Sequence, residues 1–179
     1  DGSQDKFTTI ACLLGLAADR RGSCNRIVHK ALRWHMVTHW PNNEEIPSWC
    51  TDIVQTASIY GFGLLYLETG DRLITELLVE QFEMISKQDK IKDRESYALS
   101  VGLALGMVNL GRGSNPGLED LKLDSRLLSF INGGKVAVKP GTESLDESGG
   151  IVGASRICSS NFINVDVTAS GAILALGLT

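Results

Sequence analysis

Glycine recurs at a fixed place in three mostly apolar stretches of this chain. Each stretch has one glycine inside a predicted helix and a second glycine seven residues later: Gly15 and Gly22, Gly63 and Gly70, Gly106 and Gly113. A fourth copy, at the end of the sequence, places Gly177 in the first position and stops there. The first three copies follow one another about every 45 residues, an interval typical of arrays of stacked helix pairs.

Apolar residues at helical spacing predict an all-α fold built from helix pairs. The expected helices cover residues 6–20, about 24–39, about 52–68, 72–86, 94–110 and about 117–131. Ser23 and Asp71 are expected to cap the second helix of the first and second pairs, because their side chains can accept bonds from unpaired amides. Gly70 is expected to end the helix that reaches Glu68, in the usual C-terminal glycine position.

We expect one continuous segment over residues 1–179, an α-solenoid of helix-pair repeats that forms part of a ring. The repeats are predicted at about 6–50, 51–92 and 93–131, with a truncated repeat at 167–179. Residues 132–166 are rich in glycine and serine and predict a long irregular insertion, with a short extended segment at 161–167. Since the sequence lacks an initial methionine and ends inside a helical pattern, we expect it to belong to a much larger protein.

Glycines inside the predicted helices need a physical reason, because each destabilises a helix by about 1 kcal/mol relative to alanine. Seven glycines fall in such positions: Gly15, Gly61, Gly63, Gly102, Gly106, Gly171 and Gly177. A helix without a side chain at one point allows a neighbouring helix to approach closely and gain contacts. We therefore predict that these glycines lie where helices pack most tightly.

Composition argues against nucleic-acid and membrane partners. The formal net charge is −4, and the sequence contains no run of basic residues. Gly102 and Gly106 form a GxxxG pair, but the apolar stretch 96–111 contains Ser100 and Asn109 and is shorter than the ~20 residues that a bilayer requires. The four cysteines are scattered, which favours reduced thiols in an intracellular protein.

A metal-dependent enzyme is the alternative from a different class. His35 and His39 share a helical face, and Cys24 and Cys50 flank them, so the four could supply zinc ligands. No CxxC or RING pattern accompanies them, so packed histidines beside tryptophans are the favoured interpretation, without a cofactor, a metal or a catalytic residue.

Three tryptophans, Trp34, Trp40 and Trp49, lie close together in the sequence. Core packing is the first explanation for them. An exposed tryptophan could instead anchor a partner, because tryptophan is enriched at interaction hot spots.

Two longer runs carry a specific resemblance. The run Asp93–Val108, followed by Leu110–Asn115, resembles the proteasome/cyclosome (PC) repeat family. Ile163–Thr168, leading into Gly171-Ala172 and Leu174–Leu176, is similar to a second stretch of that family. The order of the two runs is also the same, and both are most similar to the version found in the largest scaffold subunit of the anaphase-promoting complex.

The resemblance implies a ring-like α-solenoid inside a large, non-catalytic scaffold subunit of a multisubunit cullin–RING-type ubiquitin ligase. The repeat glycines Gly15, Gly22, Gly63, Gly70, Gly106, Gly113 and Gly177 would then have structural roles. The resemblance further implies control of mitosis and cell division, partners among the other subunits of that complex, and a place in the nucleus and cytoplasm. The large non-ATPase scaffold subunits of the proteasome regulatory particle also contain PC repeats and remain the alternative within the family.

Overall fold

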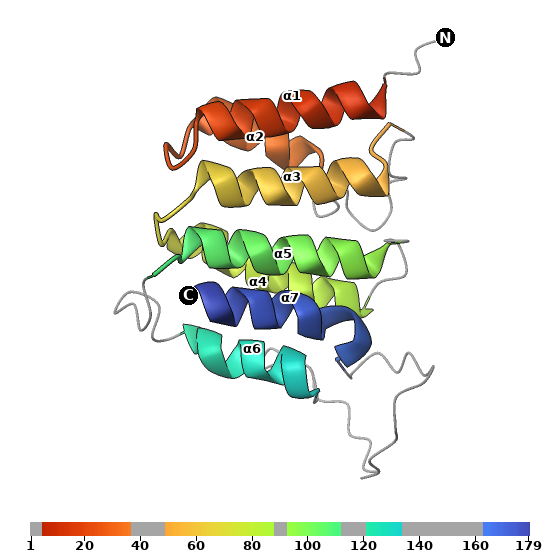
Figure 1. Cartoon of the computed structure of the whole chain (residues 1–179), viewed down its shortest axis with the longest axis vertical. Helices are drawn as coiled ribbons and strands as arrows, with labels where there is room; N and C mark the ends of the chain where they lie inside the picture. The colour runs from red at the N-terminus through yellow and green to blue at the C-terminus, as the bar shows by residue number, and fades with distance from the viewer. Residues whose placement is uncertain (1–4, 37–48, 88–92, 112–120, 134–162) are drawn as a thin grey trace, which may run out of the picture.

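The computed structural model describes residues 5–36, 49–87, 93–111, 121–133 and 163–179 (Figure 1). These residues form seven α-helices and no strand, which confirms the all-α prediction for this part of the chain. The helices are α1 (Lys6–Asp19), α2 (Arg26–Trp34), α3 (Asp52–Leu65), α4 (Arg72–Lys87), α5 (Arg94–Val108), α6 (Leu123–Asn132) and α7 (Val165–Leu178).

Four of the helices form a single parallel layer. Helices α1, α3, α5 and α7 lie one below the other and run in the same direction, with the chain's C-terminus at the left of the view (Figure 1). Helices α2 and α4 lie behind this layer, and α6 lies beside α7. We call α1, α3, α5 and α7 the inner helices, and α2, α4 and α6 the outer helices. The short connections after α1 and α3 therefore gather on the left edge, where each outer helix begins.

Acidic caps define the start of several helices. The Asp71 side chain accepts a hydrogen bond from the Ile74 amide at 3.0 Å, so the predicted cap of α4 is confirmed. Asp93 accepts from the Ser96 amide at 3.1 Å at the start of α5. Each cap satisfies an amide that has no partner within its own helix.

The predicted boundaries of α2 are wrong at both ends. The Asn25 side chain, not that of Ser23, accepts from the amides of Ile27 and Val28, at 3.0 and 3.2 Å. The Ser23 hydroxyl instead donates to the Arg20 carbonyl at 2.6 Å, so this serine belongs to the turn. The helix ends at Trp34, before the expected end at His39, a residue outside the described ranges.

Three other helix ends differ from expectation. Helix α3 ends at Leu65 rather than Glu68, and α5 ends at Val108 rather than Leu110. Helix α6 begins at Leu123 rather than near 117, because Lys122 has a left-handed φ of 46°, which an α-helix cannot include. The start of the predicted helix, 117–120, lies outside the described residues, and so does Gly113.

The extended segment predicted at 161–167 is wrong where it can be followed. Helix α7 already begins at Val165, so the irregular region ends earlier than the expected boundary at 166. Most of that predicted insertion, 134–162, lies outside the described residues. The repeat boundaries therefore stay a prediction.

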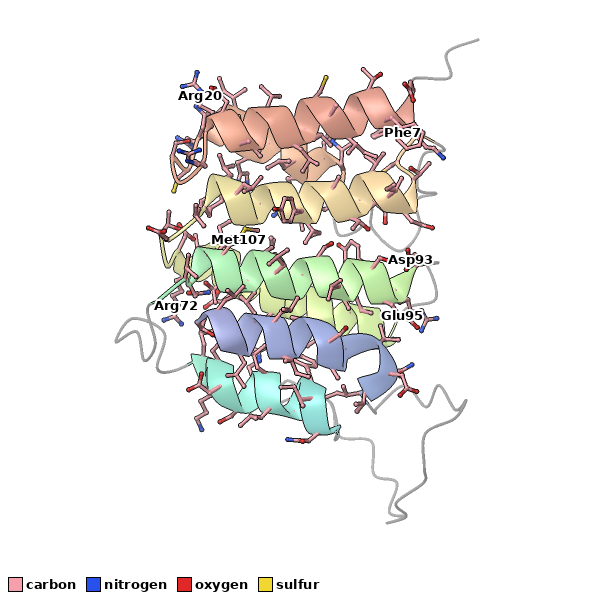
Figure 2. All side chains as sticks on the ribbon, viewed as in Figure 1. Phe7, Arg20, Arg72, Asp93, Glu95 and Met107 are labelled. Carbon is pink, nitrogen blue, oxygen red and sulfur yellow. The ribbon has the colours of Figure 1, made fainter. Side chains whose placement is uncertain are left out.

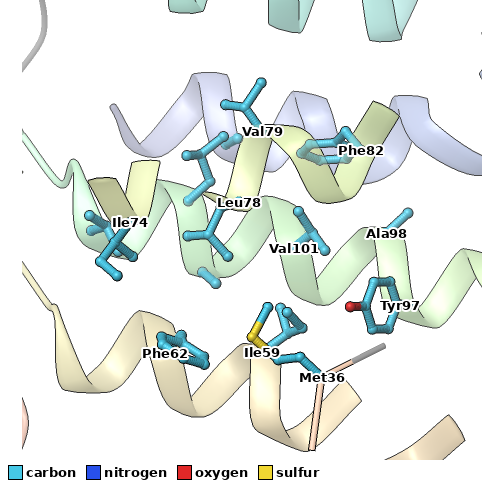
Figure 3. Packing of buried hydrophobic residues seen from close by; sticks show 14 of the residues in the cluster. Met36, Ile59, Phe62, Ile74, Leu78, Val79, Phe82, Tyr97, Ala98 and Val101 are labelled. Carbon is cyan, nitrogen blue, oxygen red and sulfur yellow. The ribbon is translucent and has the colours of Figure 1, made fainter. Parts of the chain in front are cut away.

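A continuous apolar core lies between the inner and outer helices (Figure 3). Phe62, Leu78, Phe82 and Tyr97 are among its fully buried side chains. Within the described residues, no helix is both long enough and apolar enough to span a membrane.

Candidate functional site

The contacts between neighbouring inner helices depend on residues with little or no side chain. At Gly63 of α3, a Cβ atom would overlap the Met107 methyl group and the Ala104 Cα of α5, and it would lie 3.1 Å from the Ala104 Cβ. At Gly61, on the opposite side of α3, a Cβ would lie 2.7 Å from a methyl group of Leu32 and 3.5 Å from the Ala17 Cβ. Helix α3 therefore uses one glycine to approach the pair before it and another to approach the helix after it.

The contact between α5 and α7 is a direct approach of two backbones. A Cβ at Gly102 would overlap the main chain of Gly171, and a Cβ at Gly171 would overlap the carbonyl of Ala98. One turn further along, a Cβ at Gly106 would lie 2.7 Å from the Leu178 Cβ. The predicted close approach is thus confirmed at Gly61, Gly63, Gly102, Gly106 and Gly171.

The same prediction is wrong for Gly15 and Gly177. Among the described residues, a Cβ at either position would meet no atom within 4 Å beyond the backbone of its own helix turn, and both glycines are exposed. Gly15 belongs to α1 and Gly177 to α7, the first and last helices of the layer (Figure 1). Neither glycine therefore contacts a neighbouring helix among the described residues.

Backbone hydrogen bonds join the turn after each inner helix to the end of the next inner helix. The amides of Gly22 and Cys24 donate to the carbonyls of Leu64 and Leu65, at 3.0 and 3.3 Å. The next turn repeats the pattern, with Glu68 donating to Met107 at 2.9 Å and Gly70 to Val108 at 2.8 Å. Gly111 donates to the Leu178 carbonyl at 3.1 Å. These bonds satisfy terminal carbonyls that otherwise have no partner within their own helix.

The turns also share an unusual backbone shape. Gly22, Glu68 and Gly111 have φ values of +66°, +60° and +65°. Cys24 and Gly70 have φ values of +54° and +59°. The backbone therefore matches Gly22 with Glu68 and Cys24 with Gly70, a register two residues different from the one that the glycine spacing predicts.

This register explains the position of Gly15. It aligns Gly15 with Gly61, which faces the preceding helix pair, rather than with Gly63, which faces the following helix. Ala17, aligned with Gly63, faces α3 and lies near Gly61. Sequence reasoning could not find this, since Cys24 and Glu68 occupy positions where glycine is normally favoured.

Gly106→Leu is expected to lower the free energy of unfolding by about 1–3 kcal/mol, because a branched side chain would be forced against Leu178. Leu178 lies in the last turn of α7 and can shift, which limits the loss. Urea denaturation of the full chain measures the effect. An unchanged midpoint would contradict the close contact between α5 and α7.

Buried polar side chains connect the inner and outer helices. The Tyr97 hydroxyl donates to Gln81 Oε1 at 2.9 Å, joining α5 to α4. The Ser58 hydroxyl donates to the Leu32 carbonyl at 2.5 Å, joining α3 to α2. The Thr168 hydroxyl donates to the Phe130 carbonyl at 2.8 Å, joining α7 to α6. Since a buried polar atom without a partner is costly, each bond favours one arrangement of its helix pair.

His29 on α2 packs against the end of α3. Its Nδ1 lies 2.8 Å from the Tyr66 hydroxyl, and its ring meets Phe62 edge-on at 5.2 Å between centroids. Burial raises the pKa of Tyr66 to about 12, so its hydroxyl keeps the proton near neutral pH. Burial, reinforced by Arg33, lowers the pKa of His29, and Asp71 opposes this only in part.

Because the folded protein favours neutral His29, its stability is expected to fall as the pH drops below the ordinary histidine pKa of 6.5. The unfolded chain takes up the proton first, and the decrease continues until His29 titrates in the folded protein. Urea midpoints at about pH 7.5 and about pH 5.5 measure this dependence. The His29→Phe variant should show a smaller decrease, and an equal one would contradict the assignment to His29.

The proposed zinc ligands do not come together. Cys24 bonds to the last residue of α3, while Cys50 precedes its first turn, so they lie at opposite ends of a helix about 20 Å long. Cys50 Sγ donates to the His35 backbone carbonyl at 3.5 Å, and burial raises the pKa of this thiol to about 11. His39 lies outside the described residues, among which no cluster of three or more potential metal ligands occurs.

The tryptophans occupy different environments. The Trp49 ring meets His35 edge-on at 5.3 Å between centroids and is partly buried. Trp34, in the last position of α2, is 49% exposed. Trp40 lies outside the described residues. Core packing therefore accounts for Trp49, whereas Trp34 has surface available for a partner.

Comparison with known proteins identifies the family. The model of the family described as "APC1 fifth domain" matches residues 26–179. Anaphase-promoting complex subunit 1 of Dictyostelium discoideum is 38% identical over 133 residues, which cover 72% of this chain and 6% of the relative. The subunit of the same name in Homo sapiens is 33% identical over 179 residues, or 97% of this chain and 9% of the relative.

A third relative has a different name. A protein of Emericella nidulans named "Negative regulator of mitosis" is 32% identical over 136 residues, 72% of this chain and 6% of the relative. The chain thus spans less than a tenth of the length of each of these three relatives. Since the family model matches most of the sequence and the relatives exceed 30% identity, the chain belongs to the family of APC1 fifth domains.

Proposed function

We propose that this chain is a non-catalytic scaffold segment of the anaphase-promoting complex, a ubiquitin ligase that controls mitosis. Its role is to hold other subunits at a fixed relative geometry, in the nucleus and the cytoplasm. The relatives named above support the complex and the process through their names. An alternative role in the proteasome regulatory particle has no support among these relatives.

The backbone contact between Gly102 and Gly171 is the observation that most favours a scaffold role. Two helices in direct main-chain contact cannot slide or rotate past one another without a clash. The bonds from each turn to the next inner helix add a second constraint at the left edge of the layer. Helices that are fixed in these two ways can hold bound subunits at defined positions, which is a structural rather than a catalytic role.

The experiment is affinity purification of the full-length protein that contains this chain from dividing cells, followed by mass spectrometry. Recovery of cullin, RING and tetratricopeptide-repeat subunits would support the proposal. A Gly102→Ala variant should recover less of these subunits, because Gly102 lies in the contact between α5 and α7, while Leu73→Ala, at an exposed site on α4, should recover as much as the unmodified protein.

Two results would contradict the proposal. Recovery of proteasome ATPases would move the protein to the alternative scaffold. Recovery of neither set would reopen the enzyme interpretation.

The isolated chain is expected to self-associate through the outer faces of α1 and α7. Leu16 on α1 and Ile173 on α7 are 48% and 56% exposed, and Leu174 adjoins Ile173. Terminal units of a stacked array expose the apolar faces that neighbours normally cover. Light scattering over a range of concentrations measures the association. Ile173→Lys should reduce the association, while Leu73→Lys, at an exposed site on α4, should not. An unmodified chain that stays strictly monomeric would contradict the expectation.

A further inference from the structure

The outward side of α2 combines a basic stripe with an apolar edge. Arg26, Lys30 and Arg33 are exposed and recur at helical spacing. Ile27 and Trp34, seven positions apart, are 80% and 49% exposed. At 3.6 residues per turn, the five side chains fall within a continuous arc of about 120°, opposite the buried Val28 and Leu32. We name these five exposed residues the α2 face.

The positive charge of the α2 face is not neutralised within the described part of the chain. Arg26, Lys30 and Arg33 form no ion pair there, in contrast to Arg72 on α4, which pairs with Glu76 at 3.0 Å. The turn before α2 adds Arg21 and also Arg20, which pairs with Asp19 at 2.9 Å. Figure 2 shows Arg20 at the left end of α1, where this turn begins. These cations do not form a continuous run in the sequence, because other residues of the turn and of α2 lie between them.

We propose that the α2 face binds an acidic, amphipathic helical segment of a protein partner. Acidic side chains of that segment would meet the basic stripe, and apolar side chains seven positions apart would cover Ile27 and Trp34. Charge complementarity favours an acidic partner for this basic stripe. The stripe is a local excess of positive charge, because the formal net charge of the whole chain is −4. The apolar edge favours a peptide over a nucleic acid, because Ile27 is exposed beside the cations and offers nothing to a phosphate backbone.

The test measures fluorescence anisotropy with the full chain and three labelled probes. The first probe is a glutamate-rich peptide with two leucines seven positions apart. The second is the same peptide with both leucines replaced by glutamine, and the third is an oligothymidylate of similar charge. The first probe should bind most tightly, and its affinity should decrease as salt screens the charges.

Two pairs of substitutions separate a specific site from general charge. Arg26→Glu with Lys30→Glu should weaken binding of the first probe by about tenfold or more. Lys6→Glu with Lys122→Glu changes the net charge equally at distant exposed positions, and it should leave binding within about twofold. If the charge-reversed variant loses its helix content, Arg26→Gln with Lys30→Gln replaces it.

The apolar edge has its own readout. Ile27→Gln should weaken binding of the leucine peptide and leave the affinity for the glutamine peptide unchanged. The proposal is overturned if the α2 variants and the distant variants bind alike, if Ile27→Gln does not change the preference for leucine, or if oligothymidylate binds more tightly than the leucine peptide. Such a result would leave the scaffold role untouched, since α2 makes its contacts with α3 through the opposite side.

Discussion

Gly102→Ala is expected to lower the free energy of unfolding by about 3 kcal/mol or more, although it adds only one methyl group. The added Cβ would overlap the carbonyl, carbonyl carbon and Cα of Gly171. These are main-chain atoms of a helix, so they cannot change rotamer to make room, and α5 and α7 would have to separate. The loss should exceed the gain of about 1 kcal/mol that alanine normally brings to a helix interior.

Gly15→Ala is the matched control, because it makes the same change inside a helix of the same layer. Beyond the backbone of its own helix turn, a Cβ at Gly15 would meet no atom of the described residues within 4 Å, so this variant should gain up to about 1 kcal/mol. The two variants therefore differ in sign, which urea denaturation of the full chain can measure. A Gly102→Ala variant as stable as the unmodified chain would contradict the backbone contact between α5 and α7.

The sequence alone predicted the helices and the purpose of most interior glycines. Apolar periodicity located α1 to α6, the truncated fourth repeat indicated α7, and the helix penalty of glycine indicated close packing at Gly63 and Gly102. Both predictions depend on local properties of the residues concerned. They hold for the described residues in any register between helix pairs. The free-energy cost of a glycine inside a helix must be offset by packing, whichever neighbour that helix contacts.

The register itself could not be predicted from glycine spacing. It depends on which turn residue has a positive φ, and Glu68 occupies that position although its side chain disfavours it. The bond from the Glu68 amide to Met107 offsets this preference, and it forms only when α5 is in place. A tertiary contact thus overrides local propensity, and the sequence around Glu68 gives no sign of it.

The α2 face escaped prediction for a related reason. Its cations are separated in the sequence by apolar and turn residues, so they form no basic run. The helix from Arg26 to Trp34 places them on one side. The expected helix, with Ser23 as cap and an end near His39, has the same spacing and would place these residues on one side as well. What the structure adds is that Val28 and Leu32 on the opposite side are buried, so the side with the cations is the exposed one.

Phe82→Ala is expected to lower the free energy of unfolding by about 3–5 kcal/mol, the usual loss for removing a buried phenyl ring. Phe82 of α4 is fully buried and stacks on Phe130 of α6, with 5.1 Å between the ring centroids. Its ring also lies beside Gly171 of α7, 3.2 Å from the position of a Cβ there. One side chain therefore connects three helices, two of which follow long stretches outside the described residues.

Leu73→Ala is the matched control on the same helix, since Leu73 is 74% exposed and should change stability by no more than about 0.5 kcal/mol. Hydrogen exchange of Phe82→Ala adds a local readout: amides of α6 and α7 should exchange faster, while those of α1 should change little. If Phe82→Ala and Leu73→Ala were equally stable, α6 and α7 could not be docked on α4 as described.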